Sequence, residues 1–154
     1  MSSDPLKRAR GLAYRLLARR ARTVKEIRDN FKRKEIPAEV STQIIDELLA
    51  AGYLNDFAYA QQYIEYHVTN KQHGPLWLRA SLQRAGIERE LISRALSAVF
   101  LPGCEEALAE QYLTKLCARA DLSPQKAMRS LLSRGFTTQA ARQAAAKVID
   151  FQEF

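Results

Sequence analysis

The sequence predicts an all-α protein in which three tandem three-helix repeats, nine helices in all, stack into an elongated, curved array. Three observations support this fold class. Apolar residues recur three and four positions apart, and no segment shows the alternating pattern of a strand. The chain also matches itself when it is shifted by about 50 residues. Helix start and stop signals divide each copy into three helices.

The self-similarity is clearest between the second and third copies. A shift of 49 aligns residues 57–100 with residues 106–149 without a gap, and ten of these 44 positions are identical. A shift of 51 aligns residues 6–49 with the second copy in the same hydrophobic phase. A single unit of this size buries little surface, so we expect the copies to share a core. The expected domains are residues 4–54, which form a basic repeat, residues 55–102 and residues 103–154.

The first copy contains a start signal for each helix. Pro5 follows an N-cap acid and suits the first helical turn. Thr23 and Glu26 have the spacing of a capping box, in which each side chain accepts a hydrogen bond from the other residue's free backbone N–H. Pro37 opens the third helix and Gly52 closes it.

The second and third copies repeat these signals. Asn55 caps the first helix of the second copy, which reopens at Pro75 and breaks at Gly86. The third copy reopens at Pro124 and breaks at Gly135. Each copy therefore consists of a long helix, a helix of roughly three turns, and a third helix of similar or slightly greater length.

Positive charge is concentrated in the first copy. The chain has a formal net charge of +7, and residues 1–34 hold 12 of its 24 Lys and Arg residues against only three acidic ones. Such an uneven field attracts nucleic acid or an acidic protein surface, although a solvated helix face is the simpler alternative.

The basic residues of this segment are the candidate binding site. Arg8, Arg15, Arg19 and Arg22 are spaced so that they lie close to one line of a helix near residues 5–20, away from its apolar face. Internal salt bridges of these arginines would favour a purely structural role. The candidate partner- or nucleic-acid-binding residues are Arg8, Arg15, Arg19, Arg22, Lys25, Arg28 and Lys32.

The sequence shows no constellation typical of an enzyme, a metal site or a cofactor site. No glycine-rich phosphate-binding loop occurs, and His67 and His73 have no Cys or His partners at metal-ligand spacing. His67 lies on an apolar helix face, which favours a hydrogen-bonded core histidine. Cys104 and Cys117 are interpreted as small helix-borne hydrophobes. Trp77 is better explained by core packing or a partner contact than by base stacking.

The expected location is the cytoplasm. No stretch approaches the ~20 apolar residues of a membrane-spanning helix, and the N-terminal segment lacks the apolar run of a secretory signal. We expect a monomer that does not contact membranes.

Several motifs of the chain resemble the RecX family of bacterial recombinase regulators. The first copy's Leu16-Leu17, Glu26-Ile27 and Phe31 are similar to the family's opening segment, and the resemblance spans nearly the whole chain. Asn55 replaces the usual first acid of the family's YLDD element, and Glu35 stands where the later copies have glycine. In the second copy the resemblance is carried by Gly52-Tyr53-Leu54-Asn55-Asp56-Phe57-Ala58-Tyr59-Ala60, Lys71-Gln72-His73-Gly74-Pro75, Leu78, Leu82 and Gly86-Ile87.

The resemblance implies a protein that binds the RecA recombinase and its nucleoprotein filament on single-stranded DNA. Members of this family inhibit strand exchange, ATP hydrolysis and coprotease activity, and so temper recombination, DNA repair and the SOS response. An elongated array could lie along the helical groove of such a filament.

Two alternatives remain open from the sequence. One is a DNA-binding protein that uses its three-helix units as helix-turn-helix modules. Glu39, Asp46 and Glu47 in the third helix of the first copy would repel phosphates, so only non-specific contact through the first two helices is expected. The other is a scaffold repeat protein with an unrelated partner.

Overall fold

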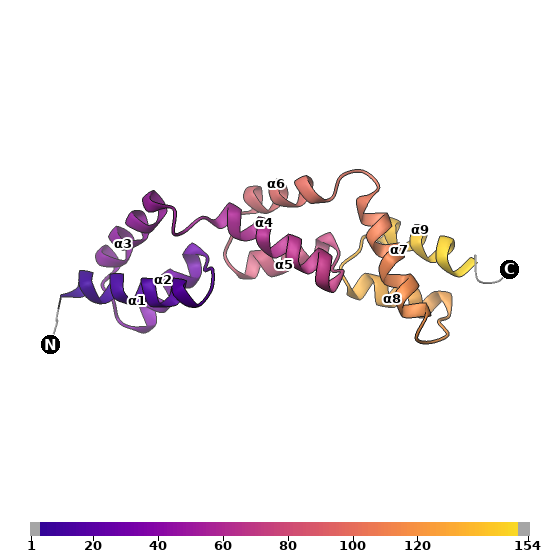
Figure 1. Ribbon diagram of the computed structural model, residues 1–154, viewed down its shortest axis with the longest axis horizontal. Coiled ribbons are helices and arrows are strands. Elements are labelled where there is room, and N and C mark those ends of the chain that lie inside the picture. Colours follow the sequence, from indigo (N-terminus) through magenta and orange to yellow (C-terminus); the bar gives the residue numbers. More distant parts are fainter. Residues whose placement is uncertain (1–3, 151–154) are drawn as a thin grey trace.

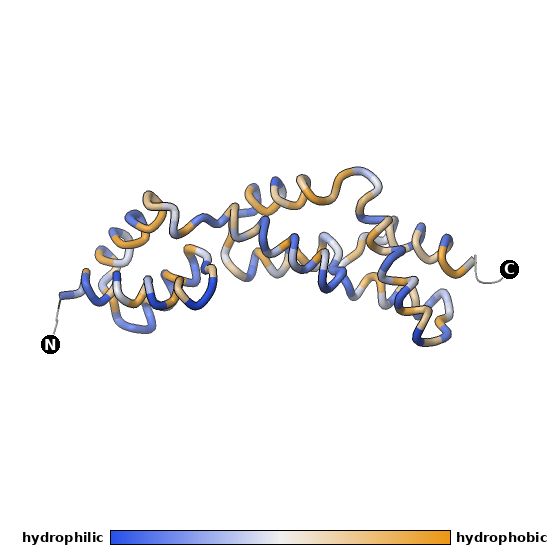
Figure 2. The backbone as a smooth tube through the Cα atoms, in the orientation of Figure 1, coloured by the Kyte–Doolittle hydropathy of each residue, from blue (hydrophilic) through white to orange (hydrophobic). Residues whose placement is uncertain are grey.

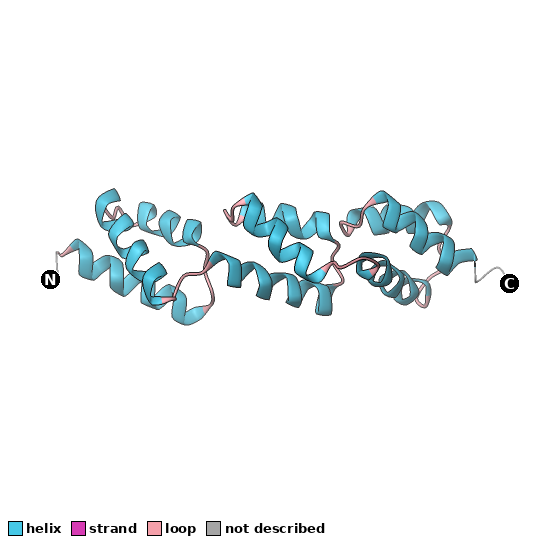
Figure 3. Ribbon diagram, turned by 90° about the horizontal axis from the view of Figure 1, so that it is seen from above, coloured by secondary structure: helices cyan, strands magenta, loops and turns pink. Residues whose placement is uncertain are grey.

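The computed structural model describes residues 4–150, and this part of the chain contains nine α-helices and no strand. Figures 1 and 3 show three units in a row, with the two ends of the chain at opposite ends of an elongated molecule. The expected all-α repeat fold is confirmed. The helices are α1 (Pro5–Arg19), α2 (Val24–Arg33), α3 (Ala38–Ala51), α4 (Asp56–Tyr66), α5 (Pro75–Arg84), α6 (Arg89–Val99), α7 (Cys104–Cys117), α8 (Pro124–Ser133) and α9 (Thr138–Asp150).

Each unit of three helices has its own buried cluster. The three clusters draw their buried residues from 9–54, 60–96 and 108–149, which are compatible with the expected domain boundaries. Hydrophobic and hydrophilic stretches alternate along every helix in Figure 2, as expected for helices with one apolar face. The largest side chains without solvent contact are Ile27, Phe31 and Ile44 in the first unit, Ile64, Leu78, Leu82 and Ile92 in the second, and Leu113, Leu131 and Phe136 in the third.

The predicted helix starts are confirmed by side-chain caps. At α2, Thr23 Oγ1 accepts a hydrogen bond from the backbone N–H of Glu26 at 3.2 Å. The reciprocal half of the expected capping box is replaced, because the Glu26 carboxylate pairs with Arg20 at 3.1 Å. The other capping side chains are Asp4 at α1, Asn55 at α4 and Ser123 at α8.

A five-residue π-helical turn, His67–Lys71, continues α4 and was not predicted. It ends at Gln72, which has a left-handed backbone conformation with φ +54°. The wider turn lets the chain leave α4 toward the start of α5 and brings His67 against His73.

The repeats are joined by the same kind of contact at both junctions. The first turn of the second helix of one repeat packs on the turn between the second and third helices of the next repeat. At the first junction Thr23 Oγ1 donates to the carbonyl oxygen of Ala85 at 2.7 Å. At the second junction the backbone N–H of Gly74 donates to the carbonyl oxygen of Arg134 at 2.8 Å. Thr23 and Gly74 are equivalent under the shift of 51, and Ala85 and Arg134 under the shift of 49.

Thr23 has two roles at the first junction, and its loss should be costly. Replacing Thr23 with valine keeps the shape of this fully buried side chain but removes the cap of α2 and the bond to Ala85. We expect the free energy of unfolding to fall by about 2–3 kcal/mol in a denaturant titration. The matched control is Ser123→Ala, because the exposed Ser123 caps only α8 and should cost about 1 kcal/mol. Equal losses would mean that the bond between the repeats contributes nothing.

Candidate partner and nucleic acid interface

Helix α1 presents a row of arginines to solvent. Arg8, Arg15 and Arg19 are exposed, whereas Ala9 and Ala13 on the opposite side are fully buried. The 15-residue helix holds these three arginines close to one line, as their spacing predicted.

The prediction for Arg22 was wrong in its position. Helix α1 ends at Arg19, because Arg20 adopts an extended conformation with φ −165°. Arg22 therefore lies in the loop before α2, where it is half-buried and its Nε donates to the carbonyl oxygen of Leu16 at 3.4 Å. Arg22 therefore donates a hydrogen bond to a carbonyl group in the last turn of α1 and does not extend the exposed row.

Two other arginines of the first repeat form ion pairs with acidic residues. Arg10 pairs with Glu47 at 3.2 Å and Arg20 pairs with Glu26 at 3.1 Å. Within residues 4–150, none of the four arginines predicted on the α1 line forms an ion pair. The row on α1 thus keeps its charge uncompensated by close contacts inside the described chain.

Helix α2 carries a second row, formed by Lys25, Arg28 and Lys32, which lie three and four positions apart and are all exposed. Lys25 also makes contacts within the protein. Its ammonium group pairs with Asp29 at 3.3 Å, and its aliphatic stem packs on Gly86 of the second repeat.

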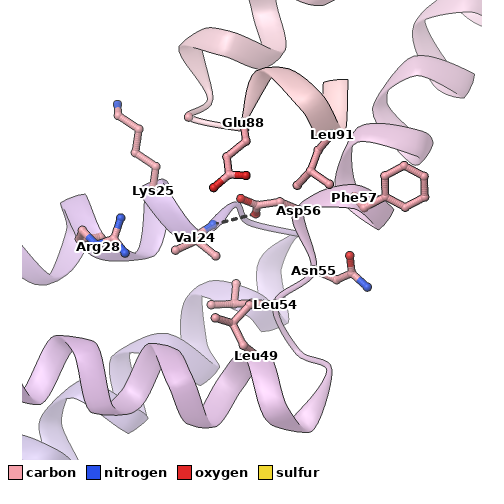
Figure 4. A pocket seen from close by; sticks show the side chains of 11 residues that line it. Val24, Lys25, Arg28, Leu49, Leu54, Asn55, Asp56, Phe57, Glu88 and Leu91 are labelled. Carbon is pink, nitrogen blue, oxygen red and sulfur yellow. Dashed lines mark hydrogen bonds between the residues drawn. The ribbon is translucent and has the colours of Figure 1, made fainter. Parts of the chain in front are cut away.

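Lys25 and Arg28 also line a cleft between the first and second repeats, which we call the junction cleft (Figure 4). Its volume is about 520 Å³. Figure 4 shows the Asp56 carboxylate directed at Val24, whose backbone N–H donates to Asp56 Oδ1 at 3.0 Å. The remaining lining residues are Leu49, Leu54, Asn55, Phe57, Gly86, Glu88 and Leu91.

The junction cleft carries both signs of charge. Burial is the main cause that raises the pKa of Asp56, and the hydrogen bond from Val24 opposes it. The neighbouring Glu26 and Glu88 raise this pKa further, while Arg28 lowers it. A cleft lined by the carboxylates of Asp56 and Glu88 as well as by two cations does not suit a polyanion, so the exposed rows are the better candidates for phosphate contact.

A second cleft, which we call the N-terminal cleft, lies between α1 and the turn after α2. Its volume is about 290 Å³. Arg8 and Arg15 line it, together with two cations that were not predicted, Lys7 and Lys34. Lys7 lies off the arginine line and Lys34 lies beyond the end of α2, so helix periodicity could not group them with the others. The apolar part of the lining is Gly11, Leu12 and Ile36.

The histidines form a structural pair at the start of α5. His67 Nδ1 and His73 Nδ1 are 3.2 Å apart, and the ring of His73 stacks on Trp77 with 3.4 Å between ring centres. Burial, with Arg134, His67 and Lys71 nearby, lowers the pKa of His73 to about 4. Trp77 is half-buried in this stack, as the packing interpretation predicted.

The buried His73 should make the protein less stable in acid. Its pKa is about 4 in the folded chain and 6.5 in the unfolded one, so the unfolded chain binds the proton first. The stability from His73 is complete above pH 6.5 and is lost as the pH falls toward 4, by up to about 3 kcal/mol. Urea titrations across this range should show a smaller fall for His73→Phe, which keeps a stacking ring but cannot bind a proton. Parallel curves for both proteins would contradict this assignment.

Metal sites, membrane-spanning helices and cysteines are three further features that bear on function in the same residues as the basic rows, 4–150. It holds no group of three or more His, Cys, Asp or Glu residues placed to bind a metal ion. Among its helices, none has the length and apolar character needed to cross a membrane. Cys104 and Cys117 are free thiols at the two ends of α7.

Two family models match the chain. The model described as the first three-helix domain of RecX matches residues 9–48, and the model of the second three-helix domain of RecX matches residues 55–96.

Curated relatives carry the same name. A regulatory protein RecX from Streptomyces lividans is 30% identical over 92% of this chain and 79% of its own length. A RecX from Listeria monocytogenes is 28% identical over 93% of this chain, and one from Lacticaseibacillus paracasei is 34% identical over 58% of it. The chain spans 55% of the Listeria relative and 36% of the Lacticaseibacillus relative.

Two solved structures share the fold. The crystal structure of RecX from Lactobacillus salivarius superposes with a TM-score of 0.84 at 21% identity, covering 95% of this chain and 97% of that one. A second crystal structure of a regulatory protein RecX gives a TM-score of 0.78 at 26% identity, over 91% of this chain and 71% of that one.

Proposed function

The chain belongs to the RecX family of regulatory proteins, and we propose that it inhibits the RecA recombinase by binding RecA and its filament on single-stranded DNA. In this role it tempers recombination, DNA repair and the SOS response in the cytoplasm. It acts without a cofactor and without catalysis of its own, so ATP hydrolysis in its presence comes from RecA alone.

The observation that supports the proposal is a set of exposed cations on the first repeat that form no ion pair within the described residues. Arg15 and Arg19 on α1 and Lys32 on α2 are exposed and form no ion pair within residues 4–150. Their field reaches an anionic partner before contact and is screened over about 8 Å at physiological ionic strength. Both single-stranded DNA and an acidic protein surface inside a filament fit this chemistry.

The shape of the array supports the same role. Three units in a row give an elongated surface (Figure 1), and the first unit holds 12 of the 24 Lys and Arg residues of the chain. A body of this form can touch several protomers of a helical filament while its basic end meets phosphates or acidic side chains. The second and third repeats then supply the remaining contacts with protein.

A second candidate function is direct, non-specific DNA binding without RecA. The same basic rows favour it, since phosphate contacts need only exposed cations. Glu39, Asp46 and Glu47 are all exposed on α3, so this helix does not suit the major groove. Base-specific readout is therefore not part of either proposal.

Co-sedimentation separates these functions. The protein would be incubated with RecA filaments on single-stranded DNA, with RecA and nucleotide alone, and with the DNA alone. We expect it to pellet with the filaments and to inhibit strand exchange at the same concentrations. Binding to naked DNA as tight as to filaments, without inhibition, would instead support the second candidate. No binding to either would refute both.

A further inference from the structure

The two internal junctions need a glycine where the repeats meet. Gly86 and Gly135 have φ values of +88° and +92°, and each lies under the neighbouring repeat. A Cβ atom on Gly86 would be 2.8 Å from Lys25 Cγ, and one on Gly135 would be 2.8 Å from Trp77 Cα. A side chain at either position therefore occupies the space of the preceding repeat's helix.

The equivalent turn of the first repeat has a side chain instead. Glu35 has the same left-handed backbone with φ +57°, is exposed, and corresponds to Gly86 under the shift of 51. The turn thus forms without glycine, so the conformation of the backbone is not the only reason for glycine at the internal junctions. Close approach of another repeat is the second reason.

The carbonyl group beside Glu35 is also already bonded. At the internal junctions the carbonyl oxygens of Ala85 and Arg134 accept hydrogen bonds from the preceding repeat. The equivalent carbonyl oxygen of Lys34 accepts from the guanidinium group of Arg8 at 3.2 Å. Arg8, which was predicted to bind a partner, thus supplies the hydrogen bond that a preceding repeat supplies at the internal junctions.

The complementary half of a junction is exposed at the other end. Ser123 and Pro124 open α8 and are exposed, whereas the equivalent Thr23 and Gly74 are buried under the next repeat. Ser123 offers both donors used elsewhere, a hydroxyl group as in Thr23 and a backbone N–H as in Gly74. Residues 4–150 therefore present an exposed donor half at α8 and, at the turn after α2, an acceptor half that Arg8 already occupies.

We propose that Glu35 and Arg8 close the acceptor half against α8 of a second copy of this chain, and so prevent head-to-tail assembly. A contact of this kind repeats without closure and would produce filaments of the protein itself. The side chain of Glu35 fills the place of the docking helix, and Arg8 occupies the acceptor. Lys7, Arg15 and Lys34 add repulsion toward a helix N-terminus, whose dipole end is positive.

The test removes both closing groups in the double variant Arg8→Ala with Glu35→Gly. Glycine suits the left-handed conformation of residue 35, so the variant should fold with unchanged helical content by circular dichroism. Sedimentation equilibrium should give a single-chain mass for the wild type at every concentration. The variant should show a weight-average mass that rises with concentration beyond that of one chain.

Two controls make the result specific. Arg8→Ala with Glu35→Asn frees the carbonyl but keeps a side chain in the turn, and it should remain monomeric. Adding Ser123→Arg to the double variant places a long cationic side chain where the equivalent Thr23 and Gly74 are buried at the internal junctions, and it should restore the monomer. A monomeric double variant, assembly of the asparagine control, or assembly that survives Ser123→Arg would each overturn the proposal, as would self-association of the wild type.

Discussion

Replacing Gly135 with alanine should lower the free energy of unfolding by about 3 kcal/mol or more, although it adds only one methyl group. The left-handed backbone costs alanine roughly 1–2 kcal/mol, and overpacking adds about 1–3 kcal/mol. The obstructing atoms are the backbone N and Cα of Trp77 and its Cβ, and the neighbouring Leu76 N–H donates to the Gly135 carbonyl oxygen at 2.9 Å. Moving α5 away would therefore break a bond that joins the second and third repeats.

Gly52→Ala is the matched control, because Gly52 has a φ value of +83° but a Cβ atom added there would have no neighbour within 4 Å. It should cost only the conformational part, about 1–2 kcal/mol. Urea unfolding of both variants separates the two contributions. Losses of the same size would show that Gly135 is needed only for its backbone conformation and would weaken the account of the junctions.

The fold was predictable because residues close together in the sequence mark where the helices of each repeat begin. Asp4, Thr23, Asn55 and Ser123 cap the helices that the sequence assigned to them, and each cap needs only residues two or three positions away. The docking role of Gly86 and Gly135 was not predictable in the same way. Both glycines were recognised as helix breaks, but the atoms that forbid a side chain belong to another repeat.

The candidate site was predictable only as rows along helices. Periodicity placed Arg8, Arg15 and Arg19 on one side of α1, where they are exposed. It could not place Arg22, because the end of α1 depends on the extended conformation of Arg20. The bond from Arg8 to the backbone of the α2–α3 turn was likewise invisible, since it joins residues 26 positions apart.

The charge of the first repeat should matter more for partner binding than any other surface charge. In the triple variant Arg15→Glu, Arg19→Glu and Lys32→Glu, three exposed cations become anions. Arg22 is kept because it bonds the end of α1, and Arg28 because it lies beside Asp56. The variant should retain its helical content, since the replaced side chains lie off the apolar faces. Its affinity for RecA filaments on single-stranded DNA should fall roughly ten- to hundredfold at physiological salt.

A salt titration of filament binding and of strand-exchange inhibition gives the decisive measurement. If phosphates are the partners, the slope of log affinity against log salt should decrease by about 0.7 for each lost contact, or roughly 2 for all three. The matched control reverses three exposed arginines of the third repeat, Arg119, Arg129 and Arg142, and so changes the net charge equally. An equal loss in this control would assign the effect to net charge alone. Unchanged affinity and slope in the first-repeat variant would mean that its basic rows are only solvated, and the contact surface would then lie on the second and third repeats.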